Sequence, residues 1–195
     1  MQIPYFGILS ILLSLNAFSQ ASLSDFKYEP SEAYPFGRPN PDAPEQIKDY
    51  QDIIGLSDCK SLKRDSQGEW LKDSVDVIWR FKYIMNGMAV QDESLKADQV
   101  HTSSIRQFDK EAGKWYVTFY SSAAPSNSLT AWEGGMNGGK MILYKEQKAP
   151  NGMDGFFKIT FYDISKNGFN WRGEWVDPKE KFAYPTWYLF CTKRN

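Results

Sequence analysis

The chain has 195 residues, with 23 lysine and arginine residues against 24 aspartate and glutamate residues and one histidine. This length favours a single domain whose core is large enough to fold without metals or many disulfides. A formal charge of −1 without a basic cluster excludes the electrostatic pattern of a nucleic-acid binder, and an aromatic share of 16% excludes a disordered chain.

The N-terminus has the features of an export signal. Residues 1–24 carry no charged side chain, and residues 8–15 form an apolar run that is too short to span a bilayer. We expect residues 1–20 to be a signal peptide, cleaved near Ser19 to Ala21, with a buried N-terminal helix as the alternative. The mature protein is then a periplasmic or extracellular monomer without stable membrane insertion.

Two segments precede the main domain. Residues 21–43 contain four prolines, which predicts an extended leader without regular structure. From residue 44 onward, Ile47, Tyr50 and Ile53 recur at helical spacing and Gly55 follows as a stop, which predicts a short N-terminal helix. We place the main domain at residues 44–195.

The rest of the chain has the pattern of β-strands. Apolar residues alternate with polar ones in residues 75–85, and similar runs follow at residues 114–120, 157–161, 169–175 and 187–191. Four Asn-Gly pairs lie between such runs, where type I′ hairpin turns favour this dipeptide. The pattern predicts an all-β, single up-and-down closed barrel of about ten antiparallel strands, with a β-sandwich as the alternative.

Cys59 and Cys191 are the two cysteines of the chain. In an exported protein they are candidates for one disulfide, and closing a barrel would place the first strand beside the last and bring them together. Two buried free thiols are the alternative. Neither cysteine has a histidine or other base nearby in the sequence to make it a nucleophile.

Four segments carry a resemblance to a known family: IIGLSDCKSL, IWRFKYIMNGMAVQDES, SSIRQFDKEAGKWYVTFYSS and FYDISKNGFNWRGEW. Over residues 41–191 the chain resembles the uncharacterised secreted bacterial proteins grouped as lipocalin-like, or calycin-like, β-barrels of unknown function. One departure is Ser57, where the family has a tryptophan two residues before the cysteine. The resemblance implies a barrel with an interior cavity and supplies no catalytic residue.

The aromatic face of the predicted strands is the candidate binding site, because a barrel of eight or more strands either fills with side chains or encloses a small ligand. Arg106 and Tyr116, with Gln107, are possible polar anchors, although a register shift of one residue would turn them outward. The predicted ligand-binding residues are Trp79, Phe81, Arg106, Trp115, Tyr116, Phe119, Phe161, Trp171 and Trp187.

Catalytic and cofactor motifs are few. His101 is the only histidine, which excludes multi-histidine zinc sites, and as a residue at a strand start it is expected on the surface rather than on a haem iron. The glycines at 134–139 surround an Asn-Gly turn between two predicted strands, and they lack the Lys-Ser/Thr pair and the following helix of a phosphate-binding loop. The sequence therefore predicts no catalytic residue, metal or cofactor.

Three functions remain open. We expect an exported barrel that binds a small apolar or amphipathic ligand without transforming it. The first alternative is an isomerase or lyase using Asp92, Arg172 or Glu174, of which alternation is expected to turn Arg172 and Glu174 outward. The second is an envelope interaction module, suggested by the aromatic residues at 34–36 in the leader.

Overall fold

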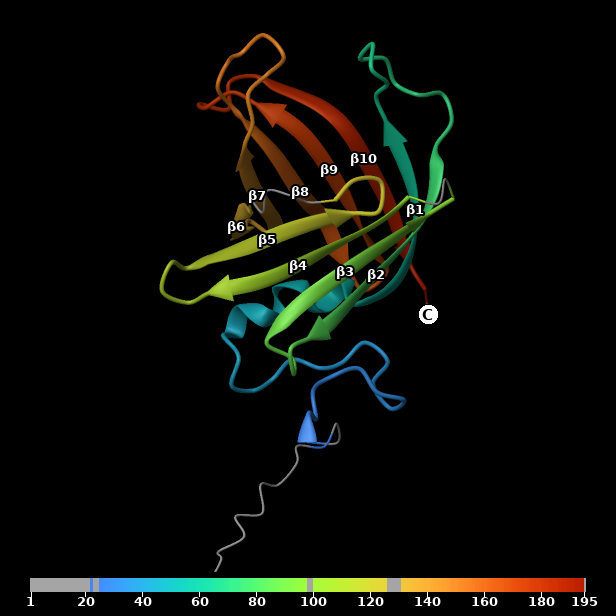
Figure 1. Cartoon of the computed structure of the whole chain (residues 1–195), viewed down its shortest axis with the longest axis vertical. Helices are drawn as coiled ribbons and strands as arrows, with labels where there is room; N and C mark the ends of the chain where they lie inside the picture. The colour runs from blue at the N-terminus through green and yellow to red at the C-terminus, as the bar shows by residue number, and fades with distance from the viewer. Residues whose placement is uncertain (1–21, 23–24, 98–99, 126–130, 195) are drawn as a thin grey trace, which may run out of the picture.

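The structure is a computed structural model that describes residues 22, 25–97, 100–125 and 131–194. The predicted signal peptide and its cleavage region lie outside these residues. The described chain forms one short 3₁₀ helix, η2, followed by ten strands (Figure 1). Their bounds are η2 Glu45–Ile53, β1 Gly55–Lys63, β2 Val75–Ile84, β3 Ala89–Lys96, β4 His101–Asp109, β5 Lys114–Ser121, β6 Trp132–Asn137, β7 Lys140–Glu146, β8 Phe156–Ser165, β9 Gly168–Val176 and β10 Ala183–Lys193.

The ten strands form one closed barrel. Each strand pairs antiparallel with the next one in the sequence, and β1 pairs with β10 to complete the circle. This confirms the predicted up-and-down barrel and excludes the sandwich. No helix within the described ranges is long and apolar enough to cross a membrane.

Alternation along the strands sets which side chains enter the barrel. In β2, Val77, Trp79, Phe81 and Tyr83 are buried, whereas the residues between them are partly exposed. Residues paired across neighbouring strands face the same side of the sheet. The inward face of β2 therefore fixes the inward face of every other strand through the pairing register.

The predicted disulfide is confirmed. Cys59 of β1 is paired directly with Cys191 of β10 in the sheet, and their sulfur atoms are bonded at 2.04 Å. The bond joins residues that are 132 positions apart in the sequence. It therefore ties the first strand of the barrel to the last.

Helix η2 covers one end of the barrel, which we call the closed end. The helix buries Ile47, Tyr50 and Ile53. The Tyr50 ring packs edge-on against Trp115, with ring centroids 4.9 Å apart. Figure 1 shows η2 below the strands, and the long connections from β1 to β2, β7 to β8 and β9 to β10 at the opposite edge.

The leader is bonded to the closed end through the turn between β2 and β3. Tyr28 N donates to Asn86 Oδ1 at 3.1 Å, and Asn40 Nδ2 donates to the Asn86 carbonyl oxygen at 3.0 Å. Tyr83 N donates to the carbonyl oxygen of Phe36 at 2.9 Å. The aromatic segment at residues 34–36 thus has contacts within its own chain.

All four Asn-Gly pairs lie where one strand connects to the next, as predicted, but their turn conformations differ. Asn86 and Gly87 have φ values of 51° and 77°, which fits the type I′ turn. Asn137, Asn151 and Asn167 do not have positive φ, so the type I′ prediction is wrong at these three pairs. In the β6–β7 turn, positive φ falls instead on Gly138 and Gly139.

We predict that Gly87→Ala releases the leader without opening the barrel. A β-carbon at Gly87 would lie 2.4 Å from the Arg38 carbonyl oxygen and 2.6 Å from Asn40 N. We expect residues 25–43 to be cleaved about tenfold faster in limited proteolysis, as a loss of about 1.4 kcal/mol in docking would give. Gly138→Ala is the matched control, because Gly138 also has positive φ but nothing lies within 4 Å of its added β-carbon. Equal cleavage of the two variants would contradict leader docking.

Candidate ligand-binding site

A cavity of about 360 Å³ lies inside the barrel, on the side away from η2. It is bordered by residues of β1 to β5 and β8 to β10, together with Trp132 of β6. Its walls are mainly aromatic, and small hydroxyl residues such as Ser94, Thr102 and Ser104 line one side. The aromatic wall residues are Trp79, Phe119, Trp132, Phe157, Trp171 and Trp187.

Eight of the nine predicted ligand-binding residues face the interior, and they divide into two levels. The cavity itself is lined by Trp79, Arg106, Phe119, Trp171 and Trp187. Phe81, Trp115 and Phe161 lie beneath it, each fully buried and packed toward Tyr50 or one another. These three form a packed aromatic core, so the interior is a cavity in one half and a solid core in the other.

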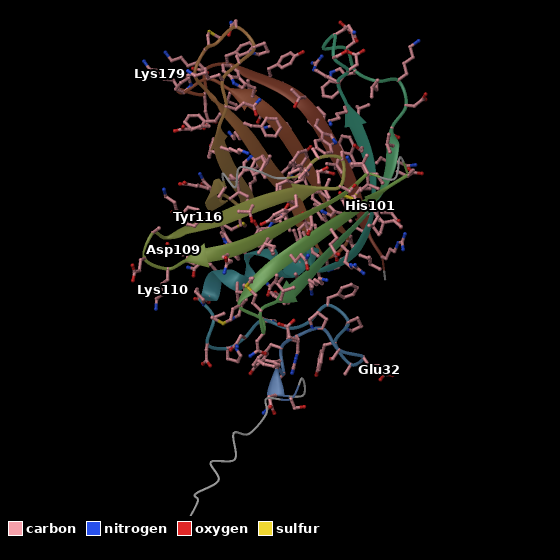
Figure 2. All side chains as sticks on the ribbon, in the orientation of Figure 1. Glu32, His101, Asp109, Lys110, Tyr116 and Lys179 are labelled. Atoms are coloured by element: carbon pink, nitrogen blue, oxygen red, sulfur yellow. A yellow bond between two sulfur atoms is a disulfide. The ribbon has the colours of Figure 1, made fainter. Side chains whose placement is uncertain are left out.

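Tyr116 lies on the outer face and does not line the cavity (Figure 2). Its paired neighbours in the sheet are Gln107 and Glu133, whereas the inward residues Trp115 and Val117 flank it. Of the two adjacent aromatic residues in β5, the register therefore turns Trp115 in and Tyr116 out. Gln107 faces outward for the same reason.

A buried polar network lies at the floor of the cavity. Asp92 of β3 accepts hydrogen bonds at Oδ2 from Arg106 Nη2 and Trp79 Nε1, both at 2.9 Å. Its Oδ1 accepts a hydrogen bond from Ser104 N at 2.7 Å. The Arg106 and Asp92 side chains are only 2% and 5% exposed, so this ion pair is shielded from water. Both carboxylate oxygens of Asp92 are thus occupied.

Aromatic rings enclose the charge of Arg106. Its Cζ lies 5.1 Å from the ring centroid of Phe81 and 5.4 Å from that of Tyr50. Burial opposes its charge, but Asp92 and Tyr50 more than offset this, so the pKa of Arg106 lies above its ordinary value. Burial also raises the pKa of Tyr50 far above its ordinary value, against the lowering effect of Arg106. Arg106 is therefore a cation and Tyr50 a neutral phenol at physiological pH.

Lysines border the cavity at the end of the barrel opposite η2, which we call the mouth. Lys63 of β1 and Lys96 of β3 line the cavity, and Lys145 of β7 is inward-facing beside Phe157. Sequence reasoning missed all three. The signal was present, since each lysine continues the inward alternation of its strand.

Arg172 and Glu174, the acid–base candidates in β9, lie on its outer face, as alternation predicted. They form an ion pair with 2.8 Å between Arg172 Nη2 and Glu174 Oε1. Their paired neighbours in β8 are Thr160 and Lys158, whereas the inward residues of β9 include Trp171. Asp92 is the one acid–base candidate that faces the cavity.

His101 is exposed at the start of β4 and is paired with Leu95 on the outer face (Figure 2). It therefore cannot ligate an iron inside the barrel. No group of three or more histidine, cysteine, aspartate or glutamate residues in the described part of the chain is arranged to hold a metal ion.

A larger hollow of about 1000 Å³ lies on the outer surface over β6 and β7. Several polar groups around it are paired with one another: Lys114 Nζ lies 3.2 Å from Glu133 Oε2, and Tyr144 Oη donates to Glu180 Oε1 at 2.7 Å. Its wall includes the three glycines Gly113, Gly134 and Gly135, which offer little side-chain surface to a ligand. The interior cavity is therefore the stronger candidate site.

Comparison with known proteins identifies no relative, so the function is inferred from the cavity. The chain matches no protein-family model and no curated protein. What the site can do chemically thus follows from its own geometry, which combines an aromatic wall, a neutralised polar floor and a cationic mouth.

Proposed function

We propose that this protein is an exported, lipocalin-like barrel that carries a small apolar or amphipathic ligand in its interior without transforming it. The observation that carries the proposal is the aromatic cavity of about 360 Å³. Apolar pockets with a few placed polar groups are the usual form of small-molecule sites. At about 30 Å³ for each water-sized group, the cavity has room for about a dozen non-hydrogen atoms.

The chemistry of the wall supports an apolar occupant. Trp79, Trp171 and Trp187 contribute broad ring surfaces, and the Trp79 and Trp187 N–H groups are already bonded to Asp92 and Ser61. Burying aromatic surface against an apolar ligand is favourable, because it removes that surface from contact with water. Export is supported by the Cys59–Cys191 disulfide, which is compatible with an oxidising compartment.

Native mass spectrometry of the mature protein, isolated from an exporting host, tests the proposal. We expect a complex heavier than the denatured chain by the mass of one small molecule, which is released on denaturation. A mass equal to that of the chain with its disulfide, together with no uptake of added dodecanol or dodecanoate, would contradict the carrier function.

We predict that Ser104→Phe abolishes ligand uptake. Ser104 lines the cavity and is 6% exposed, so a phenyl ring at this position fills the space that a ligand would occupy. Its backbone N–H, which binds Asp92, is retained. We expect at least about tenfold weaker binding, a loss of about 1.4 kcal/mol or more, measured by calorimetric titration with dodecanol. Thr118→Phe is the matched control, because Thr118 lies on the outer face of β5, and unchanged binding in both variants would place the ligand elsewhere.

A further inference from the structure

The charges that face the barrel interior are strongly biased toward one sign. Within the strand residues that the structure describes, five inward-facing side chains are cationic and one is a carboxylate. The cations are Lys63, Lys96, Arg106, Lys145 and Lys193, and the carboxylate is Asp92. The chain as a whole has a formal charge of −1, so the bias belongs to the interior and not to the composition.

Two of these cations lie away from the mouth. Arg106 is neutralised by Asp92 at the cavity floor. Lys193 lies at the closed end, where its Nζ donates to the Asp52 carbonyl oxygen at 2.9 Å. The remaining three are the lysines at the mouth.

The mouth lysines stand against the aromatic wall of the cavity. Lys63 Nζ and Lys96 Nζ lie 4.4 Å and 5.0 Å from the same ring centroid, that of Trp187. Across the barrel, Lys145 Nζ lies 4.5 Å from the ring centroid of Trp132. The two ammonium groups therefore place positive charge beside one ring at the mouth, and an anion bound there is attracted to both.

Arg106 at the cavity floor attracts an anion less strongly than the lysines at the mouth do. Arg106 Nε and Nη1 are buried and have no hydrogen-bond partner among the described residues, but Nη2 is bonded to Asp92, whose negative charge repels an anion. Lys63, in contrast, is exposed at the mouth while still lining the cavity. A bound carboxylate at the mouth therefore keeps part of its hydration, and an apolar chain attached to it reaches down the aromatic wall.

We infer that the ligand is an amphiphile with an anionic head group, bound with its apolar chain in the cavity and its head between Lys63 and Lys96 at the mouth. This rests on the carrier function proposed above and adds the charge and the orientation of the ligand. Lys145 contributes to the same positive field from the opposite side of the mouth.

Calorimetric titration of the mature protein with dodecanoate and with dodecanol tests the inference, because the two probes share a chain and differ in the head group. We expect dodecanoate to bind about tenfold more tightly than dodecanol at low salt, with the difference shrinking as salt is added. Equal affinities, or tighter binding of dodecanol, would overturn the inference and leave the carrier function intact. Binding of neither probe, together with a ligand-free mass in native mass spectrometry, would overturn both.

The double variant Lys63→Gln/Lys96→Gln assigns the head-group position. We expect it to weaken dodecanoate binding by about tenfold and dodecanol binding by less than about twofold. The control is Lys110→Gln, in the β4–β5 turn far from the mouth, which loses one positive charge without touching the cavity (Figure 2). A full preference for dodecanoate in a folded double variant would overturn the proposed orientation. The comparison of the two probes on the unmodified protein still tests the ligand charge if that variant does not fold.

Discussion

Replacing Asp92 by alanine is expected to lower the free energy of unfolding by about 3 to 5 kcal/mol, because it leaves the buried Arg106 charge without its partner. The guanidinium is 2% exposed, and among the residues that the structure describes no other carboxylate is bonded to it. The substitution also removes the acceptor of Trp79 Nε1 and of Ser104 N. Urea unfolding followed by tryptophan fluorescence measures the change.

Two further variants isolate the cause. Glu93→Ala removes a carboxylate from the next position of the same strand, but on the outer face, where Glu93 pairs with Arg80. That loss is expected to stay below about 1 kcal/mol, since the pair is partly exposed. The double variant Asp92→Ala/Arg106→Leu should recover much of the stability, because no unpaired charge stays buried. Equal losses in Asp92→Ala and Glu93→Ala would contradict this account of the floor.

Removing the Cys59–Cys191 disulfide is expected to cost a similar amount. A bond that closes a loop of 132 residues restricts the unfolded chain, and the chain-entropy model gives about 4 to 5 kcal/mol for a loop of that size. The hydrogen bonds between β1 and β10 remain in the reduced protein. We therefore expect a folded barrel with a much lower urea midpoint and not an unfolded chain.

The measurement compares oxidised protein, reduced protein and the variant Cys59→Ala/Cys191→Ala. The reduced protein and the variant should share the lower midpoint, and reductant should leave the variant unchanged. A loss below about 1 kcal/mol on reduction would mean that strand pairing alone restrains the chain ends, contrary to the entropy argument.

The sequence by itself determined the barrel and most of its inner face. Alternation is a local property with a period of two residues, so Trp79, Phe81 and Trp171 could be assigned to one side of their strands without knowing what lay across from them. The disulfide prediction followed from the predicted closure, because a meander that closes into a barrel places its first strand next to its last.

Only the tertiary structure decided what occupies that inner face. Which of Trp115 and Tyr116 points inward, and that Asp92 meets Arg106, depend on the register between strands, where a shift of one residue reverses every side chain. The division of the interior into a packed aromatic core and a cavity depends on η2, whose Tyr50 fills the closed end. Lys63 and Lys96 lie against the ring of Trp187 only because closure of the barrel places β10 beside β1, and no local pattern encodes a meeting of residues so far apart in the chain.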